Sequence, residues 1–238
     1  MSLNGIICLA LIPARGGSKG VHRKNMRFVG GVPLIKYTID AALGTRFIDQ
    51  TYVSSDDNEI LNFSAKSGAS TIFRTQECSN DLSNASSVVD HFFNSLDVEL
   101  MKQDPYVFYL QPTSPLRTAM HLNECCQTVI DLKVKTLLSV VKSNQSPFKS
   151  FIKNSKDELQ ALFDESMTNK RRQDLPDTYY PNGAIYLFRS SDFYNKGKAF
   201  PSNGSFPYLM LQKDSIDIDT EEDLELVNRL MEKEDGSI

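Results

Sequence analysis

Short apolar runs alternate with amphipathic segments along the first part of the chain. Residues 6–12 form an unbroken apolar run that ends at Pro13, which is typical of a strand covered on both faces and too short for a helix. Similar runs predict further strands at 51–54, 71–74, 106–110 and 136–141. Apolar positions at helical spacing predict helices at 33–43, 58–67, 86–102 and 121–133.

This alternation of strands and helices, without internal repeats, predicts an α/β fold with a doubly wound, mostly parallel sheet. Ligands bind such sheets beyond the carboxyl ends of the strands. Polar residues gather where the predicted strands end, at residues 13–20, 54–56, 74 and 111–117. We therefore expect these loops to share one cleft.

The pattern changes after the fifth predicted strand. Residues 143–177 are rich in lysine and arginine and read as an insertion out of the sheet. A turn and a strand follow at 181–188, and a further strand is predicted at 208–211. The last helix is predicted to begin at Thr220, which forms a capping box with Asp223. We expect residues 1–238 to form a single α/β domain that carries the insertion at 143–177.

Composition narrows the possible classes of protein. The chain has 238 residues, 40% of them hydrophobic and 24% charged, which is ordinary for a globular protein. A net charge of -4 argues against a general nucleic-acid binder. No membrane span or signal peptide is expected, and the cysteines have neither disulfide-framework nor zinc-site spacing, so we expect a cytoplasmic protein. The cysteines are Cys8, Cys78, Cys125 and Cys126.

The loop after the first strand concentrates glycine and positive charge. Three glycines between residues 16 and 20 allow a sharp turn that points several N–H groups at one place. The nearby cations are Arg15, Lys19, Arg23 and Lys24. This combination suits a polyphosphate, although the spacing matches neither a Walker loop nor the dinucleotide-binding fingerprint. The alternative is an ordinary surface loop.

Two carboxylates near the C-terminal end form the second candidate site. If the segment is a strand, Asp217 and Asp219 share one face while Ile216 and Ile218 point to the core. Such a pair suits Mg²⁺, and together with the basic loop it predicts metal-assisted nucleotidyl transfer by direct attack of a substrate hydroxyl. Alternatively, Asp219 or Thr220 only caps the last helix and Asp217 is an edge-strand charge.

Four segments together resemble the acylneuraminate cytidylyltransferase family, the CMP-sialic acid synthetases. They are residues 12–20 with 23–25, 111–117, 181–186 and 214–220, and they occur in the family's order over nearly the whole chain. The resemblance implies a Rossmann-like nucleotidyltransferase fold and a homodimer. It also implies an Mg²⁺-dependent reaction of CTP with a nine-carbon 2-keto sugar acid, a nonulosonic acid, that gives the CMP-sugar and pyrophosphate.

The resemblance also implies roles for individual residues. The triphosphate would be held by Arg15, Ser18, Lys19 and Lys24. The nucleoside would be contacted by Asn25, Arg74, Ser86 and Ser87. The sugar acid would meet Gln111, Asn182 and Tyr186, and Mg²⁺ would be bound by Asp217 and Asp219. The insertion would form the dimerisation element and bring Lys149 and Arg172 to the partner's site.

The sequence leaves the sugar and the general base open. N-acetylneuraminic acid is the first candidate, and legionaminic and pseudaminic acids are the alternatives. Enzymes for 3-deoxy-manno-octulosonate share the chemistry but have a different opening loop. Either the metal lowers the pKa of the attacking hydroxyl, or Gln111 only orients it. A catalytically silent nucleotide-binding protein on the same fold is the alternative from a different class, although Arg15, Asp217 and Asp219 are all present.

Overall fold

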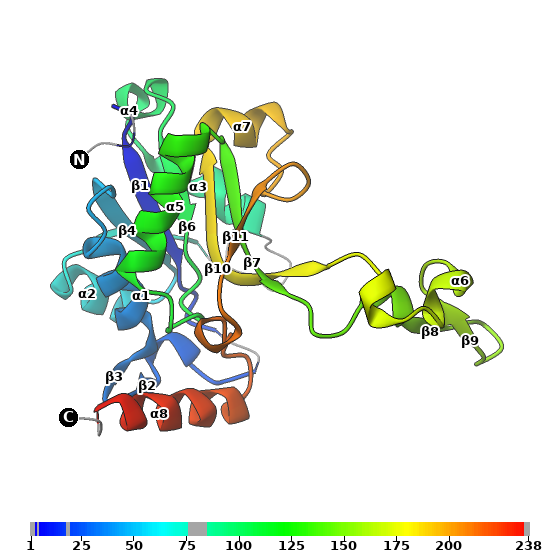
Figure 1. Cartoon of the computed structure of the whole chain (residues 1–238). Coiled ribbons are helices and arrows are strands. Elements are labelled where there is room, and N and C mark those ends of the chain that lie inside the picture. The colour runs from blue at the N-terminus through cyan, green and yellow to red at the C-terminus, as the bar shows by residue number, and fades with distance from the viewer. Residues whose placement is uncertain (1–2, 4, 18–19, 76–84, 236–238) are drawn as a thin grey trace.

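A seven-stranded sheet runs through the body of the molecule in the order β11-β7-β10-β6-β1-β4-β5 (Figure 1). The computed structural model describes residue 3 and residues 5–17, 20–75 and 85–235, with side chains up to 232. The strands are β1 (Cys8–Pro13), β4 (Gln50–Ser55), β5 (Ser70–Phe73), β6 (Tyr106–Tyr109), β7 (Thr136–Lys142), β10 (Tyr179–Arg189) and β11 (Phe206–Leu209). Only β10 runs antiparallel to its neighbours β6 and β7, so the prediction of a mostly parallel sheet is confirmed.

Helices cover both faces of this sheet. They are α1 (Leu34–Leu43), α2 (Asn58–Lys66), α3 (Ala85–Ser95), α4 (Val98–Lys102), α5 (Ala119–Leu132) and α7 (Ser190–Asn195), whereas α8 (Glu221–Asp235) lies beyond one end of the sheet (Figure 1). Alternate residues of β1 enter different cores: Ala10 lies with residues of α1 and α5, and Leu11 lies with residues of α3 and α7. Burial on both faces explains why the β1 sequence is apolar without alternation.

A third, smaller core positions the segment that carries the two predicted metal ligands. Ile218 is fully buried and packs with Leu224 and Val227 of α8. The same core includes Val29 of a short hairpin formed by β2 (Phe28–Val29) and β3 (Val32–Pro33). Because Ile218 lies between Asp217 and Asp219, this packing fixes the backbone of both aspartates.

Two sequence predictions of secondary structure are wrong. The helix predicted over 86–102 is two helices: α3 ends at Ser95, and Asp97 caps the start of α4 by accepting a hydrogen bond from Glu99 N (2.8 Å). Residues 214–220 are not a strand: a 3-10 turn, η5 (Gln212–Asp214), leads into irregular chain. Ile218 N donates to Thr113 O (2.9 Å) in the loop after β6, so this segment is held by a loop and not by a neighbouring strand.

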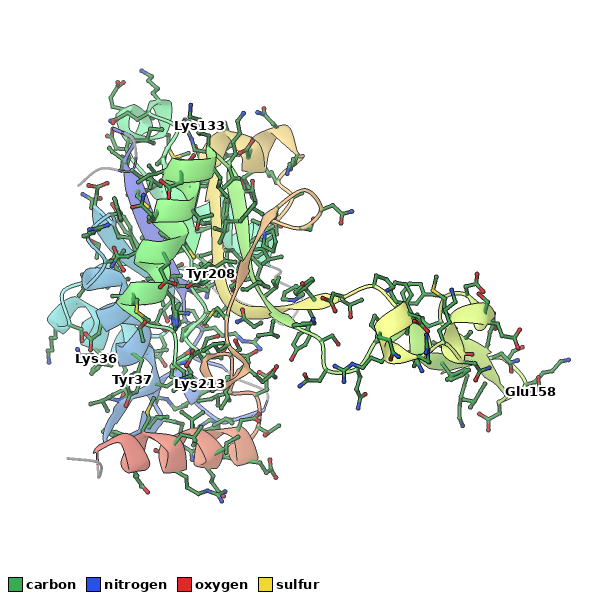
Figure 2. All side chains as sticks on the ribbon, viewed as in Figure 1. Lys36, Tyr37, Lys133, Glu158, Tyr208 and Lys213 are labelled. Atoms are coloured by element: carbon green, nitrogen blue, oxygen red, sulfur yellow. The ribbon has the colours of Figure 1, made fainter. Side chains whose placement is uncertain are left out.

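Residues 143–177, here called the arm, project away from the body between β7 and β10 (Figure 1). The arm consists of η3 (Pro147–Lys149), a hairpin of β8 (Phe151–Lys153) and β9 (Leu159–Ala161), α6 (Glu165–Thr168) and η4 (Arg172–Asp174). Glu158 lies at its far end in Figure 2. Several large apolar side chains of the arm are exposed, among them Phe151, Ile152, Leu159, Leu162 and Phe163.

None of the helices that the structure describes is long and apolar enough to cross a membrane.

Candidate active site

The glycine-rich loop after β1 is tied to the turn between β4 and α2. Gly16 N donates to Asp56 Oδ1 (2.8 Å), and the Arg23 guanidinium pairs with Asp57 (3.2 Å) and Glu59 (2.5 Å). Asp57 also caps α2, because its side chain accepts hydrogen bonds from Glu59 N and Ile60 N. A Cβ on Gly16 would lie 2.8 Å from the Cβ of Asp57, so this close approach requires glycine. The loop therefore has its own anchors in the turn after β4 and at the start of α2.

Lys24 brings the loop to the carboxylate segment. This residue begins a 3-10 turn, η1 (Lys24–Met26), and its Nζ donates to Ile218 O (2.6 Å) and to Asp219 Oδ1 (2.9 Å). A Cβ on Gly20 would lie 2.0 Å from Asp219 O, which again requires glycine. The two candidate sites found separately in the sequence are therefore side by side. Ser18 and Lys19, predicted to hold the triphosphate, lie outside the described residues.

Asn25 is buried, and its Nδ2 donates to Arg15 O (2.9 Å). This hydrogen bond joins Asn25, at the end of the basic loop, to the backbone at the start of the loop. Arg15 itself is half-buried. The predicted contact of Asn25 with the cytosine stays a prediction.

Asp217 is a half-buried carboxylate in an unfavourable environment. Its Oδ1 is buried and has no hydrogen-bond partner in the described part of the chain. Burial raises the pKa of Asp217, and the neighbouring Asp219 and Asp223 raise it further, while a hydrogen bond with Thr113 and the charge of Lys24 lower it. A cation would relieve this strain, so the donor set fits a hard metal ion such as Mg²⁺.

The described residues contain no group of three or more His, Cys, Asp or Glu side chains that could hold a metal ion. A two-carboxylate site leaves the other positions around Mg²⁺ to water and to phosphate oxygens, as that ion prefers.

The helix cap near these carboxylates is made by other groups. Asp223 N donates to Thr220 Oγ1 (3.2 Å) and Thr220 N donates to Asp223 Oδ2 (2.9 Å), which confirms the predicted capping box. The Asp219 side chain is largely exposed, and the segment is not a strand, so Asp217 is not an edge-strand charge. The cap therefore does not explain either carboxylate.

Gln111 and β10 meet at Gly183. The pairing register of β10 with β7 shifts between Pro181 and Tyr186, and Gly183 in this irregular stretch has φ of 76°. A Cβ on Gly183 would lie 2.5 Å from Gln111 Oε1 and 3.7 Å from Asp217 Oδ2. The Gln111 amide and the Asp217 carboxylate therefore both approach this glycine.

Asn182, predicted to contact the sugar, is buried and makes its hydrogen bonds within the protein. Its Oδ1 accepts from Ser139 Oγ (2.6 Å) and from Ala184 N (3.2 Å). Its Nδ2 donates to Ser215 Oγ (2.8 Å) and to Met210 Sδ (3.2 Å). Because an amide has two donors and two acceptor positions, these contacts use its full capacity. In this structure Asn182 organises the irregular part of β10.

An aromatic cluster lies beside Gln111. The Tyr186 ring is 4.4 Å from the Phe200 ring and 6.1 Å from the Tyr109 ring, measured between centroids. Burial raises the pKa of Tyr109, and the charge of the buried Arg74 opposes this shift. Predicted nucleoside and sugar residues, Arg74 and Tyr186, thus lie on either side of Tyr109. Nothing in the sequence pattern marked Phe200.

The remaining predicted residues lie elsewhere. Ser86 and Ser87 are half-buried in the first turn of α3. Lys149 and Arg172 are exposed on the arm, which projects from the body, so the single chain does not gather them with the other predicted residues (Figure 1).

A mostly parallel sheet with these loops at its carboxyl ends defines the nucleotidyltransferase fold. CMP:2-keto-3-deoxy-manno-octonic acid synthetase superposes with a TM-score of 0.68 at 18% identity, covering 96% of this chain and 99% of that one. A 4-diphosphocytidyl-2C-methyl-D-erythritol synthase from Anaerococcus prevotii gives the same TM-score at 14% identity, covering 97% and 98%.

The chain belongs to the cytidylyltransferase family, whose sequence model matches residues 9–235. It is 32% identical over 219 residues to an N-acylneuraminate cytidylyltransferase of Streptococcus agalactiae serotype V, covering 90% of this chain and 51% of that protein. It is also 32% identical over 223 residues to a pseudaminic acid cytidylyltransferase of Campylobacter jejuni subsp. jejuni serotype O:2, covering 93% and 95%. The chain thus spans about half the length of the first of these curated relatives.

Proposed function

We propose that this protein transfers CMP from CTP to a nine-carbon 2-keto sugar acid and releases pyrophosphate. The observation that carries the proposal is the meeting of the basic loop and the carboxylate pair at Lys24 and Asp219, with Gln111 and Asp217 converging on Gly183. The similarity to cytidylyltransferases for N-acylneuraminate and pseudaminic acid supports the same conclusion.

In this reaction the anomeric hydroxyl of the sugar acid attacks the α-phosphorus of CTP in line, and the bond to the β-phosphate breaks. Arg15 and Lys19 would stabilise the leaving pyrophosphate, and Lys24 with Ser18 would complete the triphosphate site. Fixed cations are effective here because phosphoryl transfer depends mainly on positioning and charge stabilisation. Gln111 would orient the attacking hydroxyl, since an amide donates and accepts hydrogen bonds but is not a base.

Asp217 and Asp219 would hold Mg²⁺, which when bound supplies positive charge beside the phosphate oxygens. Asp217 is suited to this role because its buried Oδ1 lacks a hydrogen-bond partner among the described residues. In the present structure the Lys24 ammonium provides part of the charge beside Asp219.

The nucleoside and sugar would lie on opposite sides of Tyr109. Asn25, Arg74, Ser86 and Ser87 are the proposed nucleoside residues, and Tyr186 with Gln111 and Asn182 the proposed sugar residues. The internal hydrogen bonds of Asn182 support a role in shaping that pocket from behind.

We also propose a homodimer built on the arm. Large exposed apolar side chains such as Leu159 and Phe163 are the groups that a second copy would bury. Lys149 and Arg172 would then reach the partner's site. The free, buried cysteines Cys8, Cys125 and Cys126 support a reducing compartment, and we propose the cytoplasm.

One alternative has specific support. A pseudaminic acid enzyme is favoured by the relative that this chain matches over 95% of its length, and legionaminic acid has related chemistry. A silent nucleotide-binding protein would use the same fold without turnover.

The test is a measurement of Mg²⁺-dependent pyrophosphate release for each nucleoside triphosphate against N-acetylneuraminic, legionaminic, pseudaminic and 3-deoxy-manno-octulosonic acids. We expect release with CTP and a nine-carbon acid. No release with CTP and any of these acids, from protein that still binds CTP, would favour the silent binding protein.

A further inference from the structure

Arg117 is a buried cation whose side chain touches three elements around the proposed sugar site. It is 1% exposed, and its Nη1 donates to Gln111 O (3.0 Å) and to Ala184 O (2.9 Å). Its Nη2 donates to Thr38 Oγ1 in α1. Burial lowers the pKa of Arg117 to about 9, and no neighbouring carboxylate contributes to that shift.

A buried charge without a carboxylate partner is costly, so a neutral side chain would be the cheaper way to fill this space. The guanidinium instead offers a planar set of donors in fixed directions, which an ammonium cannot reproduce. It uses them on the carbonyl of Gln111 and on the carbonyl that follows Gly183. These two carbonyls belong to the loop after β6 and to β10, and the distance between these two backbone segments determines where the Gln111 amide lies.

We propose that Arg117 is a positioning residue that holds Gln111 against Gly183 and so sets the orientation of the bound sugar acid. This inference rests on the proposed function, because Gln111 is the group expected to meet the attacking hydroxyl. Arg117 does not contact the reacting atoms itself, since Gln111 and Ala184 receive its hydrogen bonds at their backbones.

The effect should be confined to one of the two substrates. The glycine-rich loop is held by Asp56, Asp57, Glu59 and Asp219. The first three follow β4, and Arg117 donates its hydrogen bonds to other groups, so these anchors should survive its replacement. Loss of the guanidinium should therefore disturb the sugar acid and leave CTP in place.

The test compares Arg117→Lys with wild type in steady-state kinetics, with CTP and the preferred sugar acid varied in turn and rates expressed per folded molecule. Lysine keeps the charge, but its single nitrogen cannot hold the two carbonyls and Thr38 Oγ1 in the directions that Nη1 and Nη2 fix. We expect kcat/KM for the sugar acid to fall about tenfold or more, as for lost positioning, while KM for CTP stays within about twofold. A folded Arg117→Lys enzyme with unchanged sugar kinetics, or with equal losses for both substrates, would overturn the proposal.

If Arg117→Lys does not fold, Thr38→Val and Thr38→Ser form the second test. Valine removes the hydroxyl that Arg117 Nη2 contacts, whereas serine keeps it. Thr38→Val should lower kcat/KM for the sugar acid by about threefold with KM for CTP unchanged, and Thr38→Ser should not. Equal sugar kinetics for the two folded variants would then overturn the proposal. Wild-type protein assayed alongside separates these outcomes from failure of the proposed function, since that failure abolishes turnover in wild type as well.

Discussion

The arm and the edge of the sheet that carries the candidate site differ in which side chains they bury and which they expose. At that edge of the sheet, the buried amides of Asn182 and Asn25 make their hydrogen bonds within the chain. On the arm, large apolar groups are exposed: Leu159 is 69% exposed and Phe163 57%. These described loops of the body are therefore held by contacts within one chain, whereas the arm has an apolar surface that a monomer leaves in water.

This difference indicates that the body and the arm have separate roles. The body supplies a pre-formed arrangement of loop, carboxylates and Gln111. The arm supplies the surface and the cations that the proposed dimer would use. Substitutions in the body should therefore affect chemistry or folding within one chain, and substitutions in the arm should affect association.

The largest effect is expected from Asp217→Asn in the body. The amide cannot replace a carboxylate beside a divalent cation, so kcat should fall about hundredfold or more, equivalent to roughly 3 kcal/mol of lost transition-state stabilisation. Pyrophosphate release at saturating CTP and sugar acid measures this change. Asp223→Asn is the matched control, because Asp223 is a nearby carboxylate that serves the helix cap. Comparable loss in both variants would contradict a metal role for Asp217.

In the arm, Phe163→Asp should weaken association while leaving the body folded. A charge placed in an apolar interface costs roughly 3 kcal/mol, which raises the dissociation constant about hundredfold. Sedimentation velocity over a range of concentrations measures it. Ser155→Asp adds the same charge at another exposed position of the arm and is the control. If both variants dimerise as wild type does, the apolar face of the arm is not the interface.

The same substitution made in both regions should cost different amounts of stability. Asn182→Ala leaves the buried Ala184 N–H without its Asn182 partner and removes the hydrogen bonds with Ser139 and Ser215, for a loss of roughly 3 kcal/mol or about 9 °C in Tm. Asn154→Ala removes hydrogen bonds from a turn at the tip of the arm, where water replaces them, and should cost about 1 kcal/mol or less. Thermal unfolding measures both, and equal costs would contradict the contrast between the regions.

The smallest expected effect is on the pH dependence of stability, because the ionised Asp217 carboxylate lowers the free energy of unfolding. The pKa of Asp217 is raised on folding, so its ionisation destabilises the protein as pH rises through that raised pKa, and the penalty is absent in acid, where the carboxyl is protonated in both states. In metal-free buffer at neutral pH, the Tm of Asp217→Asn should be a few degrees above that of wild type, which corresponds to roughly 1 kcal/mol of unfolding free energy. In acid the two proteins should have the same Tm.

Mg²⁺ should raise the Tm of wild type at neutral pH and leave that of Asp217→Asn nearly unchanged. Equal metal responses in the two proteins would argue against binding at Asp217.

Local pattern predicted most of the body. The apolar run of β1 and the capping box at Thr220 depend on neighbours in sequence, and both are confirmed. The break at Asp97 was missed because a cap inside an otherwise helical pattern looks like an exposed polar residue. The segment around Asp217 was predicted as a strand from alternation, but its partner is the loop after β6.

The site itself depends on contacts that no local pattern encodes. Lys24 and Asp219 are 195 residues apart. Arg23 pairs with Asp57, which precedes α2, and with Glu59 in the first turn of α2. Arg117 stood in a recognised motif, yet its burial and its two carbonyl partners became visible only once β6 and β10 lay side by side. The same holds for the saturated amide of Asn182, whose partners come from three separate parts of the chain.

In the proposed dimer the arm of one subunit completes the site of the other, and mixing two defective subunits tests this arrangement. Asp217→Asn has a defective body and an intact arm, whereas Arg172→Ala has an intact body and a defective arm. Each variant alone should be nearly inactive. Co-refolded in equal amounts, half of the dimers should be mixed, each with one intact site, so activity should recover to about a quarter of the wild-type level. If the mixture stays as inactive as its components while mixed dimers form, the arm does not act across the dimer and the account is contradicted.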